Sequence, residues 1–271
     1  MSFLSSILLG IMQGLTEFLP ISSSGHLVLA QHFWGLEDTG DTLFEIFLHL
    51  GTLLAVLVFF RRKIWALIVS LAKWRNTVQN QEHRHNRNLL LYLAVASVVT
   101  GAVYLAAGDW LESLFSRPLI VACMLLATGA VVYASDLVKS SKTPSAEMGL
   151  IRSSVIGLIQ GIAIIPGISR SGSTIAGALF TGVKRSDAAE FSFLLSIPAI
   201  LGANLVSLEK FRELDKGQTG IYLAGFAAAF IAGYLVISFL IRLIQQAKLK
   251  YFAYYCWLAG TAGVILLLAG K

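Results

Sequence analysis

The sequence predicts an all-α polytopic membrane protein, an inverted-topology repeat with six transmembrane helices and two re-entrant helix–loop–helix hairpins. The first observation is composition: the 271 residues are 56% hydrophobic and 13% charged, with a mean hydropathy of +0.74, outside the range of soluble proteins. The second is a sixteen-residue passage, 10–25, that recurs at 157–172 with seven identities. We therefore expect one membrane domain, with repeats over 1–138 and 150–271.

The duplicated passages predict the two hairpins, over residues 3–35 and 150–182. In each passage, proline, serine and glycine split an apolar stretch into pieces shorter than the roughly 20 residues of a spanning helix. Unpaired backbone is tolerated at membrane depth only where it is buried in protein or lines a cavity. A polar break in an apolar helix that occurs once in each half of the chain therefore indicates the functional site.

Six other stretches are long and apolar enough to cross a bilayer at about 1.5 Å per residue. They cover residues 41–60, 88–107, 118–138, 186–207, 219–241 and 251–269. The two cysteines, Cys123 and Cys256, lie inside these stretches, so we expect small buried hydrophobic side chains and no disulfide.

The basic residues orient the chain. Seven of the 21 Lys and Arg residues lie in 61–87, which we expect to be a cytoplasmic loop by the positive-inside rule. Walking from this loop places 15 basic residues inside, five outside and Arg170 within the membrane, so the formal charge of +6 does not indicate nucleic-acid binding. Three spans separate the hairpins, so the first enters from outside and the second from the cytoplasm.

Glu17 and Arg170 bring opposite charges to membrane depth, where ionisable side chains are usually functional. Gln13 shares one helix face with Glu17. The first hairpin adds the candidates Ser22, Ser23, Ser24, Gly25 and His26, and the second adds Ser169, Ser171, Gly172, Ser173 and Thr174. Hydroxyls, two helix N-termini and an arginine favour phosphate binding. The Glu17 carboxylate is then a base or a ligand of a divalent cation, Mg²⁺ or Ca²⁺.

Other polar residues in apolar stretches have structural explanations. We expect Ser6 and Ser153 only to let helices pack closely. Glu45 and Glu190 begin two predicted spans, and a functional role and an interfacial one are equally expected for them. His49 is expected to be a buried polar contact and not a ligand.

Two motifs resemble the signatures of the undecaprenyl-diphosphate phosphatases, the bacitracin-resistance family. The first is Gln13-Gly-Leu-Thr-Glu17-Phe-Leu-Pro20 with Ser22-Ser-Ser-Gly-His26, and the second is Pro166-Gly-Ile-Ser-Arg170-Ser-Gly-Ser-Thr174. The resemblance covers the full chain. It implies a multi-pass protein of the bacterial inner membrane that uses a divalent cation to hydrolyse a polyprenyl diphosphate lipid to the monophosphate carrier of wall synthesis.

The resemblance also assigns site residues. The family's acidic motif falls on Gln13 and Glu17, its serine motif on Ser22–Ser24, its histidine on His26 and its arginine on Arg170. The family takes Glu or Gln at the first acidic position, so this chain brings one carboxylate where some members bring two. Ser23 is then either the nucleophile, with Glu17 or His26 handling protons, or a ligand beside a metal-bound water.

A second class of function fits the same residues. Inverted repeats with broken helices also build transporters, and a polyprenyl-phosphate flippase would use this site. The topology opens the first hairpin outward, which predicts hydrolysis on the periplasmic side. Apolar spans also predict a homodimer in the membrane.

Overall fold

The computed structural model describes residues 2–35, 42–72, 81–138, 142–206, 217–246 and 248–270. Helices account for every named element of these residues, with one isolated β-bridge between Thr143 and Val183. In chain order the elements are α1 (Phe3–Phe18), α2 (Ser23–Phe33), α3 (Thr42–Phe59), α4 (Arg61–Ala72), α5 (Gln81–Ser113), α6 (Pro118–Asp136), η3 (Ser145–Glu147), α7 (Gly149–Ile162), α8 (Arg170–Phe180), α9 (Arg185–Val206), α10 (Thr219–Gln245) and α11 (Lys250–Leu268).

The predicted fold class is confirmed. Five helices, α5, α6, α9, α10 and α11, are long and apolar enough to cross a membrane, and α3 joined to α4 makes a sixth candidate. Each corresponds to one of the six predicted spans. Asp41 and Ser207, at the ends of two predicted spans, lie outside the described residues.

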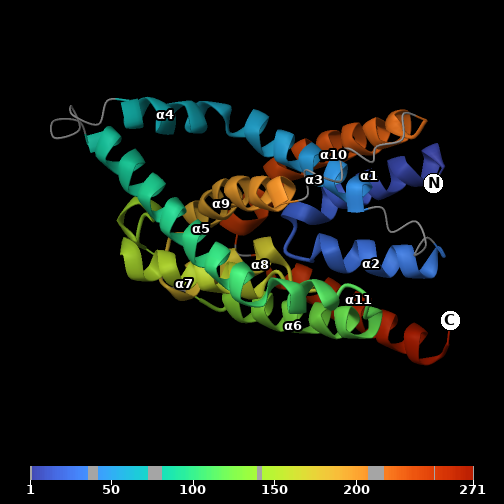
Figure 1. The fold of residues 1–271 in the computed structure, drawn as a ribbon. Coiled ribbons are helices and arrows are strands. Elements are labelled where there is room, and N and C mark those ends of the chain that lie inside the picture. The colour runs from blue at the N-terminus through green and yellow to red at the C-terminus, as the bar shows by residue number, and fades with distance from the viewer. Residues whose placement is uncertain are drawn as a thin grey trace.

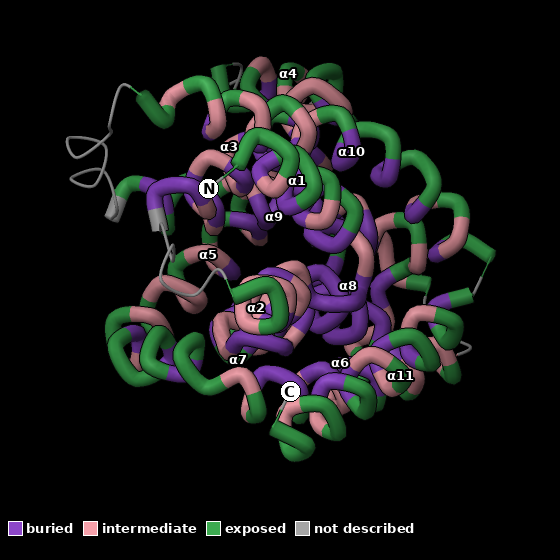
Figure 2. Tube along the Cα trace, turned by 90° about the vertical axis from the view of Figure 1, so that its right-hand side faces the viewer, coloured by how far each residue is buried: buried purple, intermediate pink, exposed green. Residues whose placement is uncertain are grey.

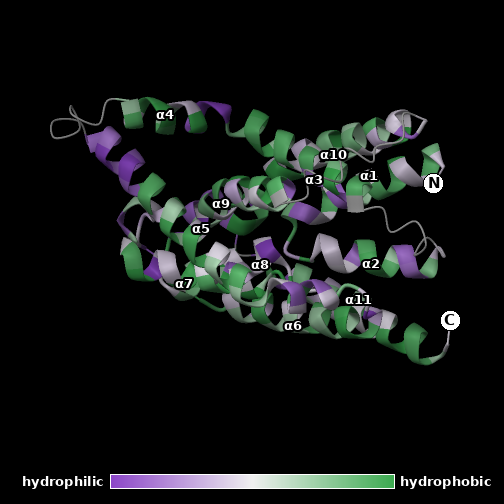
Figure 3. Cartoon of the chain, in the orientation of Figure 1, coloured by the Kyte–Doolittle hydropathy of each residue, from purple (hydrophilic) through white to green (hydrophobic). Residues whose placement is uncertain are grey.

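The prediction that residues 61–87 form a loop is wrong over much of its length. Arg61–Ala72 forms α4, which bends by 74° from α3, and α5 begins at Gln81. A helix can continue beyond the apolar span when solvent receives its polar side chains. Figure 3 shows these hydrophilic first turns of α5 at one end of the otherwise hydrophobic bundle.

Both predicted hairpins are present, as α1–α2 and α7–α8. The first opens toward the end of the molecule where both termini lie, and the second toward the opposite end (Figure 1). Serines at equivalent positions cap the helices that follow the two breaks. Ser22 Oγ accepts from the Gly25 N–H at 3.2 Å, and Ser169 Oγ accepts from the Gly172 N–H at 3.0 Å. Each break is thus an N-capped helix start.

Each hairpin packs its first helix on a span of the other half of the chain. Helix α1 lies along α10, and α7 lies along α5. The Ser6 hydroxyl donates to the Ile221 carbonyl, and the Ser153 hydroxyl donates to the Tyr92 carbonyl. The predicted packing role of these two serines is therefore confirmed.

Glycines make this close approach possible. A Cβ on Gly10 would lie 2.4 Å from the Gly225 carbonyl oxygen, and one on Gly157 would lie 2.4 Å from the Ala96 carbonyl oxygen. In lipid, such backbone-to-backbone contact is a main source of helix association. The first helix of each hairpin is therefore held against the opposite half of the chain.

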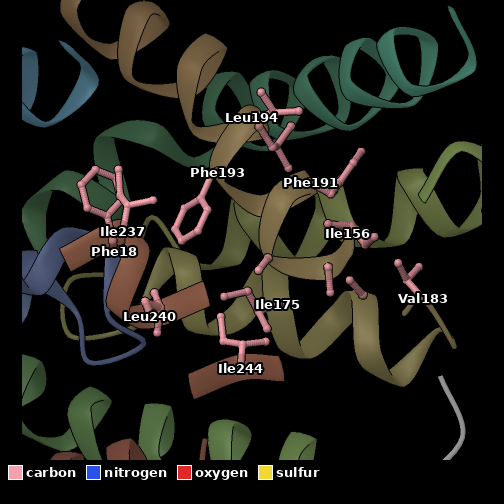
Figure 4. Packing of buried hydrophobic residues seen from close by; sticks show 14 of the residues in the cluster. Phe18, Ile156, Ile175, Val183, Phe191, Phe193, Leu194, Ile237, Leu240 and Ile244 are labelled. Carbon is pink, nitrogen blue, oxygen red and sulfur yellow. The ribbon is translucent and has the colours of Figure 1, made fainter. Parts of the chain in front are cut away.

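Helix α8 forms the centre of the bundle. Its residues from Ser171 to Leu179 are all buried, and Figure 2 shows it in the interior with other helices around it. The surrounding apolar core contains Phe18, Phe191 and Phe193 (Figure 4). The Phe18 and Phe193 rings meet edge to face, with centroids 5.7 Å apart. This ring contact holds the end of α1 against α9.

Candidate active site

An ion pair between the hairpins is the centre of the site. Glu17 lies in the last turn of α1, and Arg170 is the first residue of α8, 153 positions later. Arg170 Nη2 donates to Glu17 Oε1, and the Glu17 side chain is only 5% exposed. Two candidate charges from opposite halves of the sequence therefore meet inside the bundle.

The other oxygen of this carboxylate collects three more groups. Ser23 Oγ donates to Glu17 Oε2 at 2.5 Å, and Gln13 Nε2 donates to the same oxygen at 3.0 Å. His49 Nε2 lies 4.0 Å from it. The Ser23 hydroxyl is thus hydrogen-bonded to a carboxylate that two further groups hold in place. Activated nucleophiles and phosphate sites have this arrangement.

A helix begins at each of the two breaks. Ser22 has a φ of 68°, the only positive φ of a non-glycine among the described residues, and α2 begins directly after it. Helix α8 likewise begins at Arg170. The first N–H groups of a helix have no partner within the helix, so both starts favour an anion. A strained turn before Ser23 is also common at functional sites.

His26 points elsewhere. Its Nδ1 lies 2.7 Å from the Ser22 carbonyl oxygen, and its Nε2 lies 2.8 Å from the hydroxyl of Tyr255 on α11. Among the described side chains, neither ring nitrogen of His26 contacts Glu17. The structure thus separates the predicted histidine from the predicted carboxylate.

The hydroxyls of several predicted binding residues form hydrogen bonds within the protein. The Ser171 hydroxyl donates to the Leu19 carbonyl at 3.0 Å, and Thr174 and Ser192 pair their hydroxyls at 2.6 Å. The other predicted binding residues lie at the two breaks: Ser24 pairs with Ser22 and Ser169 with Ser171, each at 3.2 Å, and Gly25, Gly172 and Ser173 are buried beside them. These groups shape the two loops around the ion pair.

The two carboxylates at the span ends lie apart from this centre. Gln31 Nε2 donates to Glu45 at 3.1 Å, and Lys63 pairs with Glu190 at 3.1 Å. Glu190 and Lys63 line a polar cavity of about 230 Å³, together with His85, Asn86, Leu89, Pro144, Ser145, Ala146 and Asp187. This cavity shares no residue with the Glu17 site.

Two residues without a predicted role in the site, His49 and Tyr255, contact its predicted residues. His49 hydrogen-bonds the Glu45 carbonyl through Nδ1 at 2.8 Å, which turns Nε2 toward Glu17. Tyr255 reaches His26 from the last helix. The spacing of four between Glu45 and His49 is visible in the sequence, but the partners of His49 and Tyr255 depend on helix packing.

Comparison with known proteins identifies the family of this chain. Residues 6–262 match the family model described as bacitracin resistance protein BacA. The chain belongs to this family. An undecaprenyl-diphosphatase of Methanobrevibacter smithii is 42% identical over 270 residues, 96% of each chain. Undecaprenyl-diphosphatases of Carboxydothermus hydrogenoformans, 38% identical over the whole of both chains, and Treponema denticola, 41% identical over 94% of each, also resemble it. The bacitracin-resistance family was the one indicated by the two motifs.

Removing Arg170 tests the ion pair. Arg170→Gln leaves a buried carboxylate without its cation, so we expect a loss of about 3 kcal/mol of stability and of all turnover. The matched control is Arg185→Gln, because Arg185 pairs with Asp136 with the same 18% side-chain exposure. Thermal unfolding in detergent should show similar losses for both variants, and only Arg170→Gln should lose activity when assayed below its unfolding temperature. Equal activity in the two variants would contradict a functional role for Arg170.

Proposed function

We propose that this protein hydrolyses undecaprenyl diphosphate to undecaprenyl phosphate and inorganic phosphate, recycling the lipid carrier of wall synthesis and so conferring bacitracin resistance. The observation that carries the proposal is the line of contacts Ser23–Glu17–Arg170 across the two hairpins. It joins a hydroxyl, a carboxylate and a phosphate-binding guanidinium within the membrane. The names of the curated relatives supply the lipid diphosphate as substrate.

The contacts favour Ser23 as the nucleophile. Its Oγ would attack the terminal phosphorus while Glu17 Oε2, already 2.5 Å away, takes the hydroxyl proton. The bond from phosphorus to the bridging oxygen breaks, and undecaprenyl phosphate leaves with that oxygen and its electron pair. Water then attacks the phosphorus of the phosphoserine, the bond from phosphorus to Ser23 Oγ breaks, and inorganic phosphate leaves while Glu17 returns the proton to Ser23 Oγ. Arg170 and the N–H groups at the start of α2 and α8 would stabilise the charge on the transferred phosphoryl group.

The alternative is direct attack by water, with Glu17 as base and Ser23 as a binding group. The same hydrogen bond from Ser23 to Glu17 would then orient the carboxylate. His26 is poorly placed as the base for Ser23, because both of its ring nitrogens contact other groups. Glu17 is therefore the proposed base in either route.

A divalent cation, Mg²⁺ or Ca²⁺, is part of the proposal. No cluster of three His, Cys, Asp or Glu residues that could hold a metal occurs in the described parts of the chain. Glu17, the Ser23 hydroxyl and the buried Gln13 Oε1, which has no hydrogen-bond partner, fit a cation that also takes substrate phosphate oxygens as ligands. Such an ion supplies positive charge to the diphosphate.

We also propose that the protein resides in the bacterial inner membrane with its site facing the periplasm. The support is the distribution of basic residues together with the opening of the first hairpin, which carries Glu17 and Ser23, at the end opposite the basic start of α5 (Figures 1 and 3). A homodimer stays a prediction from the apolar spans.

Purified protein in detergent should release phosphate from undecaprenyl diphosphate, because hydrolysis needs no second compartment. A chelator should stop the release, and added Mg²⁺ or Ca²⁺ should restore it. Phosphate release is measured against the Arg170→Gln variant. Tight binding of the lipid with no phosphate release would contradict the phosphatase and favour a flippase.

Ser23→Ala distinguishes the two routes. If Ser23 is the nucleophile, loss of its Oγ should lower kcat by about 10³-fold or more. Ser116→Ala is the control, since this exposed hydroxyl donates only to the neighbouring Ser113 carbonyl. A kcat within about 10-fold of the unaltered protein would exclude the phosphoserine route and leave attack by water.

Labelling tests the facing of the site. Ser24→Cys in a Cys123→Ser background, which leaves only the buried Cys256, should react with an impermeant maleimide in whole cells. The control is Ser186→Cys, at an exposed position beside the start of α9 at the other end of the bundle. If position 24 is protected and position 186 is labelled in whole cells, the orientation of the protein is the opposite of the one proposed.

A further inference from the structure

The C-terminal helix brings a tyrosine to the first hairpin. The Tyr255 hydroxyl lies 2.8 Å from His26 Nε2, across 229 positions of sequence. The two rings are also stacked, with an interplanar angle of 8° and centroids 5.5 Å apart. One side chain therefore fixes both the plane of the imidazole and the partner of its Nε2.

The contacts of His26 define its tautomer. The Ser22 carbonyl oxygen can only accept, so His26 Nδ1, 2.7 Å away, carries the hydrogen. In the neutral ring Nε2 is then the acceptor, and the Tyr255 hydroxyl donates to it. His26 follows Ser23 by three residues on α2, which places both on one face of the helix.

We propose that Tyr255 is a positioning residue for the hydrolysis, acting through His26, an inference that rests on the proposed function. Tyr255 keeps the imidazole in the Nδ1–H tautomer beside the strained Ser22 turn that presents Ser23. Any proton that this ring takes up enters at Nε2, where the Tyr255 hydroxyl is its neighbour. The last helix thereby completes a site whose other residues come from α1, α2, α3 and α8.

The neighbouring tyrosine shows that this contact is specific. Tyr254 is 47% exposed and Tyr255 is 42% exposed, so burial does not distinguish them. Tyr254 instead contacts the rings of Tyr133 on α6 and Trp257 on α11. The chain thus offers an adjacent residue of the same kind as a matched control.

Tyr255→Phe should lower kcat about 10-fold with little change in KM, because it removes the hydroxyl but keeps the stacked ring. Tyr254→Phe should leave both constants unchanged. In a His26→Gln background, Tyr255→Phe should have no further effect, since its partner is already lost. An undiminished kcat in Tyr255→Phe, or the same 10-fold loss without His26, would overturn the proposal.

A spectroscopic measurement separates this proposal from the phosphatase assignment. The chain has five histidines, so ¹⁵N-histidine spectra in detergent can be assigned with His26→Gln. We expect the Nδ1–H tautomer for His26, with an Nε2 resonance that shifts in Tyr255→Phe and not in Tyr254→Phe. If the spectra behave so and no phosphate is released, the pair stands and the proposed function fails. Unchanged spectra in Tyr255→Phe would overturn the pair itself.

Discussion

The Glu17–Arg170 ion pair is the interaction on which the rest of the site depends. Even the membrane-insertion scales with the lowest values put the free-energy cost of one charge at the centre of a membrane helix near 2.5 to 3.5 kcal/mol. Neither residue would therefore be stable alone in the bundle. The pair joins the end of α1 to the start of α8 and so fixes how the two hairpins meet. The second oxygen of the same carboxylate lies next to Ser23, Gln13 and His49.

Packing between the halves makes this meeting possible. The breaks must come within hydrogen-bonding distance at membrane depth, where exposed backbone is costly. In each half, the first hairpin helix packs on a span of the other half. A glycine of that helix lies against the backbone of the span, and a serine hydroxyl donates to one of its carbonyls. The contacts of Ser6 and Gly10 have counterparts at Ser153 and Gly157, 147 positions later in the sequence. The site therefore lies where the two copies face each other.

Chemistry comes from the places where the copies differ. Ser22 and Ser169 do the same work, each capping the helix that follows its break. The next residue is Ser23 in one copy and Arg170 in the other, which gives a hydroxyl on one side and a cation on the other. Two equal loops would present two hydroxyls or two cations, and neither pair would both bind and attack a phosphate.

The sequence by itself determined the helical membrane fold, the six spans, the hairpins and the candidate charges, because hydropathy and repetition are local properties of the chain. It also indicated the family, since both motifs are contiguous. Only the tertiary structure decided that Arg170 pairs with Glu17, that His49 joins them, and that His26 turns to Tyr255. It also turned part of the expected basic loop into α4. These outcomes depend on which helix faces which, and no local pattern in the chain specifies those contacts.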